Sequence, residues 1–108
     1  MAYLSGDTGI TAEQDAVVRR FFKANLVVMN IGGIFSTGPQ EAAWVVNELV
    51  QPKAVIASHA NEAATVDGEV QPGTKTATFI EAVSVPVHVP LSGGTMEFDG
   101  EAACVSGC

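Results

Sequence analysis

The feature that most constrains the fold of this chain is the apolar segment of residues 26–31, which leads directly into the glycine pair Gly32-Gly33. A run that is apolar at nearly every position is typical of a strand covered on both faces in a parallel sheet. Two consecutive glycines then favour a tight change of direction, because glycine adopts backbone conformations that other residues avoid. The segment therefore predicts a buried strand that ends in a short loop.

A helix is predicted to follow this loop, over residues 39–50. Thr37 occupies the position expected of an N-cap, Pro39 falls in the first turn, and Gln40 stands three residues after the threonine, as in a capping box. Pro52 ends the helix, because proline cannot continue it. The residues expected to pack on the core are Ala42, Ala43, Val45, Val46 and Leu49.

The preceding part of the chain predicts a first strand and a first helix. Residues 2–5 suit a strand, and the sequence Gly6-Asp7-Thr8-Gly9 after them favours a tight turn. Thr11 then begins a helix, with Gln14 completing a second capping box. The apolar residues that define the amphipathic face of this helix are Val17, Val18, Phe21 and Phe22.

Residues 54–57 are predicted to form the next strand, and His59 follows its end. The order strand, helix, strand, helix, strand implies right-handed crossovers and a parallel sheet. In such sheets, functional side chains gather at the carboxyl ends of the strands. Because Asp7, the Gly32-Gly33 loop and His59 all follow predicted strands, we expect them to converge at one edge of the sheet.

The rest of the chain has shorter predicted elements. Residues 60–73, rich in Asn, Asp, Gly and Pro, predict a loop, and residues 76–83 predict a short helix. Residues 85–90 contain two prolines and fit an edge strand. After a Ser-Gly-Gly turn, residues 95–98 are expected to return as its hairpin partner.

Composition indicates one folded α/β domain over residues 1–100, followed by a flexible tail at residues 101–108. An apolar content of 47% excludes a disordered chain. No apolar run approaches the ~20 residues of a membrane helix and no signal peptide is visible, so we expect a cytoplasmic protein. The formal net charge is −7 and the five Lys and Arg residues are dispersed, which argues against binding to nucleic acid or to an anionic membrane.

The two cysteines, Cys104 and Cys108, lie in the last five residues. Such a pair is compatible with metal binding or with oxidation, but zinc sites normally have four ligands and the chain has no second cysteine pair. We therefore expect these cysteines to belong to a frayed tail. His88 stands beside no other ligand type in the sequence and is interpreted as structural.

Asp7 and His59 are the candidate catalytic and metal-ligating residues, although each has a structural interpretation as well. Asp7 would then bond to its own turn or cap the helix at Thr11, and His59 would be structural or merely exposed. In the functional interpretation, the carboxylate and the neutral imidazole are both metal ligands. By themselves they do not complete a catalytic site, which usually has at least three protein ligands.

Three motifs, taken in order, resemble the metallo-β-lactamase superfamily. They are Gly6-Asp7-Thr8-Gly9, residues 30–43 (NIGGIFSTGPQEAA) and residues 52–59 (PKAVIASH). The branch that they resemble is the metal-dependent hydrolases similar to ascorbate-phosphate lactonase. The resemblance implies that Asp7 bridges two metal ions and that His59 binds one of them. It also implies a divalent cofactor, with zinc expected ahead of manganese or iron.

The resemblance covers the C-terminal half of the family's fold. A complete fold is an αββα sandwich, and its first half carries a His-x-His-x-Asp-His motif that this chain, with two histidines, lacks. The half expected here is a βαβαβ core followed by a loop, a short helix and a C-terminal hairpin. Because half a sandwich exposes a face that must be covered, we expect a homo-oligomer or a complementing N-terminal half.

Two functions follow as alternatives. The first is a truncated metal-dependent hydrolase that retains part of a dinuclear site, acts on a small-molecule substrate and needs a dimer or a complementing chain for activity. In the dimer, two Asp7–His59 pairs would supply four ligands. The second is a non-catalytic α/β remnant that oligomerises or binds a partner through its exposed face.

Overall fold

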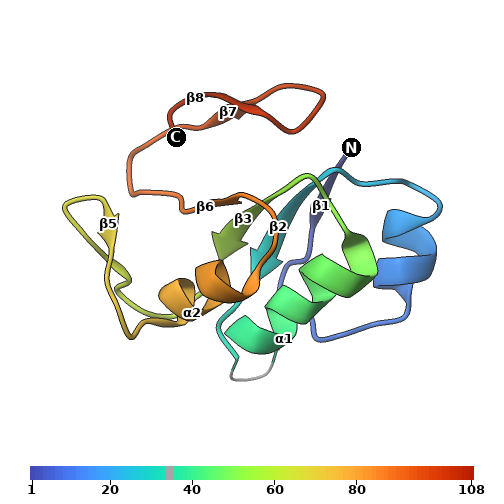
Figure 1. Ribbon diagram of the computed structural model, residues 1–108, viewed down its shortest axis with the longest axis horizontal. Coiled ribbons are helices and arrows are strands. Elements are labelled where there is room, and N and C mark those ends of the chain that lie inside the picture. Colours follow the sequence, from blue (N-terminus) through green and yellow to red (C-terminus); the bar gives the residue numbers. More distant parts are fainter. Residues whose placement is uncertain (34–35) are drawn as a thin grey trace.

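The computed structural model describes residues 1–33 and 36–108. Its centre is a four-stranded, fully parallel sheet with the strand order β1-β2-β3-β6 (Figure 1). The strands are β1 (Ala2–Leu4), β2 (Leu26–Asn30), β3 (Ala54–Ser58) and β6 (Val87–His88). Strands β2 and β3 pair along their whole length, from Leu26 opposite Ala54 to Asn30 opposite Ser58, so their carboxyl ends lie side by side.

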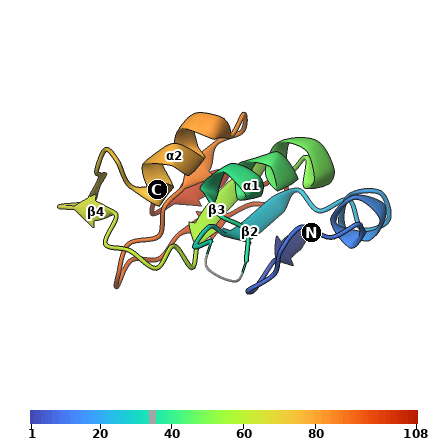
Figure 2. The same ribbon diagram turned by 90° about the horizontal axis from the view of Figure 1, so that it is seen from below.

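Four helical segments accompany the sheet: η1 (Gln14–Arg19), α1 (Pro39–Trp44), η2 (Val45–Val50) and α2 (Lys75–Ala82). Helices α1 and η2 are continuous along the chain, and η1 and η2 are π-type helices with backbone hydrogen bonds that span five residues. Helices α1 and α2 lie side by side against one face of the sheet (Figure 2). None of the helices in the described residues is long and apolar enough to cross a membrane.

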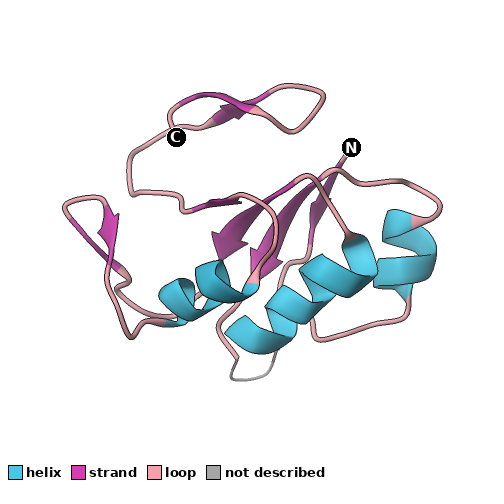
Figure 3. Cartoon of the chain, viewed as in Figure 1, coloured by secondary structure: helices cyan, strands magenta, loops and turns pink. Residues whose placement is uncertain are grey.

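Two antiparallel hairpins complete the fold, β4 (Thr65–Val66) with β5 (Glu69–Val70) and β7 (Glu97–Phe98) with β8 (Cys104–Ser106). The β7–β8 hairpin lies across the sheet from α1 and α2 (Figure 3). Within β6, Val87 packs against the core, whereas the ring of His88 contacts the Phe98 ring of the hairpin. This follows from the alternation of side chains along a strand.

The hydrophobic core lies between the sheet and the helices α1, η2 and α2. Phe79 of α2 and Met29 of β2 are the largest of its fully buried side chains. Burial of apolar side chains is the main force that holds these elements together. The core residues are Val27, Met29, Ile31, Ala42, Ala43, Val45, Val46, Val50, Val55, Ala57 and Phe79.

The predicted architecture is confirmed in its main features. The βαβαβ order, the parallel pairing, the helix over residues 39–50, the short helix near residues 76–83 and a C-terminal hairpin are all present. The helix that starts at Pro39 ends at Gln51, which has a left-handed backbone (φ 50°) just before Pro52. Ile34 and Phe35, which belong to the central motif of residues 30–43, lie outside the described residues.

The prediction of a Thr37 N-cap is wrong by one residue. Gly38 is the N-cap of α1, and the Glu41 carboxylate, not the Gln40 side chain, accepts a hydrogen bond from the Gly38 amide at 3.3 Å. The Thr37 hydroxyl instead donates to the carbonyl oxygen of Asn30 at 2.8 Å. The Thr37 side chain therefore connects the loop before α1 to the end of β2 and does not cap the helix.

The predicted amphipathic face of the first helix is also wrong. The helix begins at Gln14 rather than at Thr11, and of its four expected face residues only Val18 packs against the core. Phe21 is 75% exposed, Phe22 48% and Val17 39%. Helix η1 ends at Arg19, so Phe21 and Phe22 lie in the turn after it and do not continue the face that Val18 begins.

Three further expectations about the C-terminal part require correction. Residues 60–73 contain the β4–β5 hairpin, whose turn has positive φ at Asp67 (52°) and Gly68 (82°), as a two-residue hairpin turn requires. Strand β7 pairs with β8, not with residues 85–90, because β6 is used as the parallel edge of the central sheet. Residues 101–108, expected to be a flexible tail, instead contain β8.

Candidate metal centre

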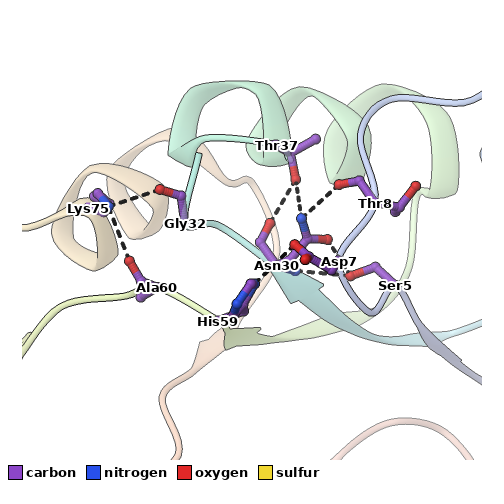
Figure 4. A network of polar contacts seen from close by, with 9 residues as sticks. All are labelled: Ser5, Asp7, Thr8, Asn30, Gly32, Thr37, His59, Ala60 and Lys75. Atoms are coloured by element: carbon purple, nitrogen blue, oxygen red, sulfur yellow. Dashed lines mark hydrogen bonds and ion pairs between the residues drawn. The ribbon is translucent and has the colours of Figure 1, made fainter. Parts of the chain in front are cut away.

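The structure brings Asp7 and His59 together at the carboxyl edge of the sheet. Asp7 follows β1 and His59 follows β3, on either side of β2. The Nδ1 atom of His59 lies 3.3 Å from the Oδ1 atom of Asp7 (Figure 4). The two side chains are 45% and 68% exposed, so the pair is accessible from solvent. This is the convergence that the order of strands predicts.

Asn30, at the end of β2, holds the turn that carries Asp7. Its side chain is fully buried, and its Nδ2 atom donates to the carbonyl oxygen of Thr8 at 2.8 Å and to the Thr37 hydroxyl at 3.0 Å. Its Oδ1 atom accepts from the Ser5 hydroxyl at 2.6 Å (Figure 4). All hydrogen-bonding groups of the amide are therefore used. Since a buried amide without partners is costly, this network fixes the residues on both sides of Asp7.

The loop that carries His59 has an unusual backbone. His59 (φ 48°) and Asn61 (φ 57°) both adopt left-handed conformations, which non-glycine residues reach at an energetic cost and which are frequent at functional sites. The loop is held against the glycine loop after β2. The Lys75 ammonium donates to the carbonyl oxygens of Gly32 at 2.9 Å and of Ala60 at 3.3 Å, so it bridges the two loops (Figure 4).

Gly32 is required at this position because the two loops approach each other closely. A β-carbon at Gly32 would lie 2.4 Å from the carbonyl oxygen of His59 and 2.7 Å from the side-chain nitrogen of Asn61. Any larger residue would therefore displace the His59 loop. Gly9, at the end of the Asp7 turn, has no such neighbour within 4 Å.

Glu62 connects this loop to the start of α2. Its Oε1 atom accepts from the Thr76 amide at 2.9 Å and from the Thr76 hydroxyl at 3.3 Å. Burial raises the pKa of Glu62, but hydrogen bonds from the backbone of Lys75 and Thr76 and from the Thr76 hydroxyl, together with the charge of Lys75, lower it to below its usual range. The carboxylate is therefore ionised at neutral pH and caps the helix.

A pocket of about 400 Å³ opens beside His59. It lies between the end of β3, the following loop, the start of α2 and the segment after β6. Its walls combine apolar and polar groups, which suits a small polar ligand. The lining includes His59, Ala60, Glu62, Thr76, Pro90 and Ser92.

The donor set of Asp7 and His59 fits a shared divalent cation. With metal–ligand bonds of about 2.0–2.2 Å, two ligand atoms on one ion are separated by roughly 3.0–3.5 Å. The observed separation of 3.3 Å lies within this range. In residues 1–33 and 36–108, however, no third histidine, cysteine or carboxylate joins this pair to make a group of three ligands. The described residues therefore place two potential ligands at this edge.

A second cluster was not predicted from the sequence. His88, Cys104 and Cys108 place their ligand atoms within 4.8 Å of one another, and the two cysteines form a disulfide. His88 was expected to stand beside no other ligand, and that expectation is wrong, because β8 and the residues after it bring both cysteines to it. The roles of Asn30, Lys75 and Glu62 were missed as well. Of these three residues, only Asn30 could have been found from the sequence, because it is a polar residue at the end of an apolar run.

Comparison with known proteins relates the chain to one group of hydrolases, although no family model matches it. It is 32% identical over 93 residues to a UPF0173 metal-dependent hydrolase of Cupriavidus necator, which covers 86% of this chain and 31% of that protein. A UPF0173 metal-dependent hydrolase of Methanocaldococcus jannaschii is 32% identical over 95 residues, covering 88% of this chain and 42% of the relative. A UPF0173 metal-dependent hydrolase of Polaromonas is 40% identical over 57 residues, covering 53% of this chain and 20% of the relative.

The chain thus spans less than half the length of these curated relatives. The matches confirm one part of the recognition made from the three motifs, the similarity to the C-terminal half of a metallo-β-lactamase-like, metal-dependent hydrolase. They do not show the ascorbate-phosphate lactonase branch.

Proposed function

Because the chain is related in sequence to one part of the UPF0173 metal-dependent hydrolases, we propose that it contributes part of a hydrolytic metal centre in which Asp7 and His59 ligate a divalent cation. The observation that carries this proposal is the 3.3 Å separation of their ligand atoms at the carboxyl edge of a parallel sheet. Zinc is the expected metal, since a carboxylate and an imidazole are both zinc ligands; manganese and iron accept the same ligands.

The chemistry of the centre divides between the metal and the chain. A bound divalent cation would supply an activated water and polarise the scissile carbonyl or phosphoryl group. Asp7 would hold the cation and offset part of its charge, and His59 would be its second ligand from this chain. Asn30 and Lys75 position the two ligands through the backbone groups of their loops. The pocket beside His59 would hold the substrate, a small ester, lactone or phosphoester.

The remaining ligands come from outside these residues in this proposal. A second copy of the chain would add another Asp7–His59 pair, and a complementing polypeptide would add the histidines of the family's first half. Exposed apolar side chains near the N-terminus are the candidates for the surface of such an association, because a large exposed apolar patch marks an interaction site. They are Leu4, Ile10, Val17, Phe21 and Phe22.

A non-catalytic domain that oligomerises or binds a partner is the second candidate function. The specific observation in its favour is the number of ligands, since a pair of side chains is fewer than the three that a catalytic metal usually has. The same exposed apolar side chains would then form the surface through which the domain oligomerises or binds its partner.

The test is the binding of Mn²⁺, measured by the loss of the free-ion electron paramagnetic resonance signal, with the oligomeric mass determined on the same sample. The disulfide is kept intact, because free thiolates would add a second place at which a metal ion can bind. Wild type is compared with Asp7→Ala and His59→Ala, and His88→Ala is the matched control at the chain's other histidine.

Saturable Mn²⁺ binding that both site variants lose and His88→Ala retains supports the metal centre, and a dimeric mass would identify the second copy as the source of further ligands. A folded wild type without saturable binding contradicts a metal centre built by this chain alone or by its dimer. If that protein is also dimeric, the non-catalytic candidate is the better account.

A further inference from the structure

Three potential metal ligands meet on the face of the sheet opposite α1 and α2. His88 ends the edge strand β6, and Cys104 and Cys108 belong to β8 and the residues after it. Their ligand atoms all lie within 4.8 Å of one another. His88 and Cys104 are partly buried and Cys108 is exposed, so a small ion can reach the cluster from solvent.

The backbone around the two cysteines is shaped to bring them together. Gly107 has a left-handed φ of 82°, and a β-carbon there would lie 1.8 Å from the carbonyl oxygen of Thr95. The chain can therefore turn back at this point only with glycine. As a result the two sulfurs lie 3.3 and 3.4 Å from the same carbonyl oxygen, that of Ser106.

The hairpin that carries the cysteines is attached to the body of the protein. The Asp99 carboxylate accepts from the amides of Glu101 at 2.8 Å and Ala103 at 3.0 Å, which fixes the loop before Cys104. Asn25 donates through its side chain to the carbonyl oxygen of Gly100 at 2.8 Å. Lys53, at the start of β3, forms an ion pair with Glu101. These contacts hold the cysteines over His88.

The ligand types select the metal. Two thiolates and one imidazole prefer a borderline or soft cation over Mg²⁺ or Ca²⁺, and Zn²⁺ is commonly bound by this combination. The spacing of the cysteines, with three residues between them, lies within the two to four that zinc motifs use. Their Cα atoms are 6.5 Å apart, which is compatible with two sulfurs about 3.8 Å apart on one tetrahedral ion.

We propose that reduced Cys104 and Cys108, together with His88, form a Zn²⁺ site that is separate from the Asp7–His59 pair and in which the fourth position is taken by water. Two thiolates balance the charge of the ion. Each thiol loses its proton on binding, so the affinity increases with pH. The site does not depend on the proposed hydrolytic function, because it shares no residue with it.

The disulfide and the zinc site exclude each other in this proposal. Zinc binding requires that the disulfide takes up two electrons and two protons to give two thiols. A trialkylphosphine supplies these electrons and becomes the phosphine oxide, whose oxygen comes from water. Oxidation of the thiols by a disulfide or by oxygen would release the zinc and restore the bond. The cluster would thus exchange zinc according to the redox state of its surroundings.

Cobalt substitution of the full chain tests the site. The protein is reduced with a phosphine under anaerobic conditions, and Co²⁺ is added until binding is complete. The expected result is a near-ultraviolet thiolate-to-cobalt absorption band that one equivalent of Zn²⁺ abolishes. The band should be lost in Cys104→Ser, Cys108→Ser and His88→Gln, and it should remain in His59→Gln, the matched control. No band in reduced wild type, or an unchanged band in His88→Gln, overturns the proposal.

A second measurement needs no variant. The rate at which the two thiols of reduced wild type react with an aromatic disulfide reagent is compared in the presence of a chelator and of one equivalent of Zn²⁺. The proposal predicts that zinc protects both thiols and that the chelator restores their reactivity. Equal rates under the two conditions overturn it, whatever the stability of the variants.

Discussion

Asn30 is the single residue on which the geometry of the Asp7 turn most depends, since its amide connects β1, β2 and the loop before α1. Replacement by alanine leaves the carbonyl of Thr8 and the hydroxyls of Ser5 and Thr37 without this partner. A buried polar group without a partner costs about 1–3 kcal/mol.

We therefore predict that Asn30→Ala lowers the free energy of unfolding by about 2 kcal/mol and weakens Mn²⁺ binding at the Asp7–His59 pair. Chemical denaturation and metal titration measure the two effects. Asn47→Ala is the control, because the Asn47 side chain bonds to Ala82 and Ser84 on the far side of the core and should leave metal binding unchanged. Full metal binding in Asn30→Ala would contradict the positioning role.

At the scale of single elements, the approach of two loops determines where His59 lies. Gly32 allows the loop after β2 to touch the loop after β3, and a β-carbon there would overlap the His59 carbonyl. Gly32→Ala should therefore displace His59 and abolish saturable metal binding, with a smaller effect on the far-ultraviolet circular dichroism. Gly9→Ala adds the same methyl group in open space and should bind metal as the wild type does. Equal binding by both variants would refute the steric argument.

The start of α2 provides a test through pH. The pKa of Glu62 is lower in the folded protein than its ordinary value of 4.5, so the carboxylate stabilises the folded state above that pH, and this contribution is lost as the pH falls through the folded pKa. Glu62→Gln should accordingly be less stable than wild type at pH 7, and the difference should shrink as the pH is lowered below 4.5. Chemical denaturation over this pH range measures this. A difference that grows on acidification would contradict it.

Elements set by local sequence were the ones predicted well. The apolar runs of β2 and β3 and the proline after η2 determine strands and a helix end within a few residues, and their order alone predicts that Asp7 and His59 meet. The N-cap was misplaced because the partner of Thr37 is Asn30, on another element. The cluster of His88 with Cys104 and Cys108 depends on the β7–β8 pairing, which no local pattern shows.

For the whole molecule, the unexpected feature is the exposure of apolar side chains in the first strand, the first helix and the turn that follows this helix. Because Phe21 and Phe22, in the turn after η1, are exposed to solvent, they contribute little to the stability of a single chain. Phe21→Ser with Phe22→Ser should therefore reduce the oligomeric mass of the protein, measured by sedimentation, with little change in its unfolding. Val66→Ser, on the exposed strand β4, is the control. A wild type that is monomeric at high concentration would contradict a role of Phe21 and Phe22 in association.

The central claim is that Asp7 and His59 together bind one divalent cation. Anomalous diffraction at the zinc edge, from crystals of the disulfide-bonded chain soaked in Zn²⁺, tests it most directly. We expect an anomalous peak about 2.0–2.2 Å from both the Asp7 carboxylate and Nδ1 of His59. Crystals that show no peak between these two side chains, at a zinc concentration that occupies other surface ligands, would contradict the claim.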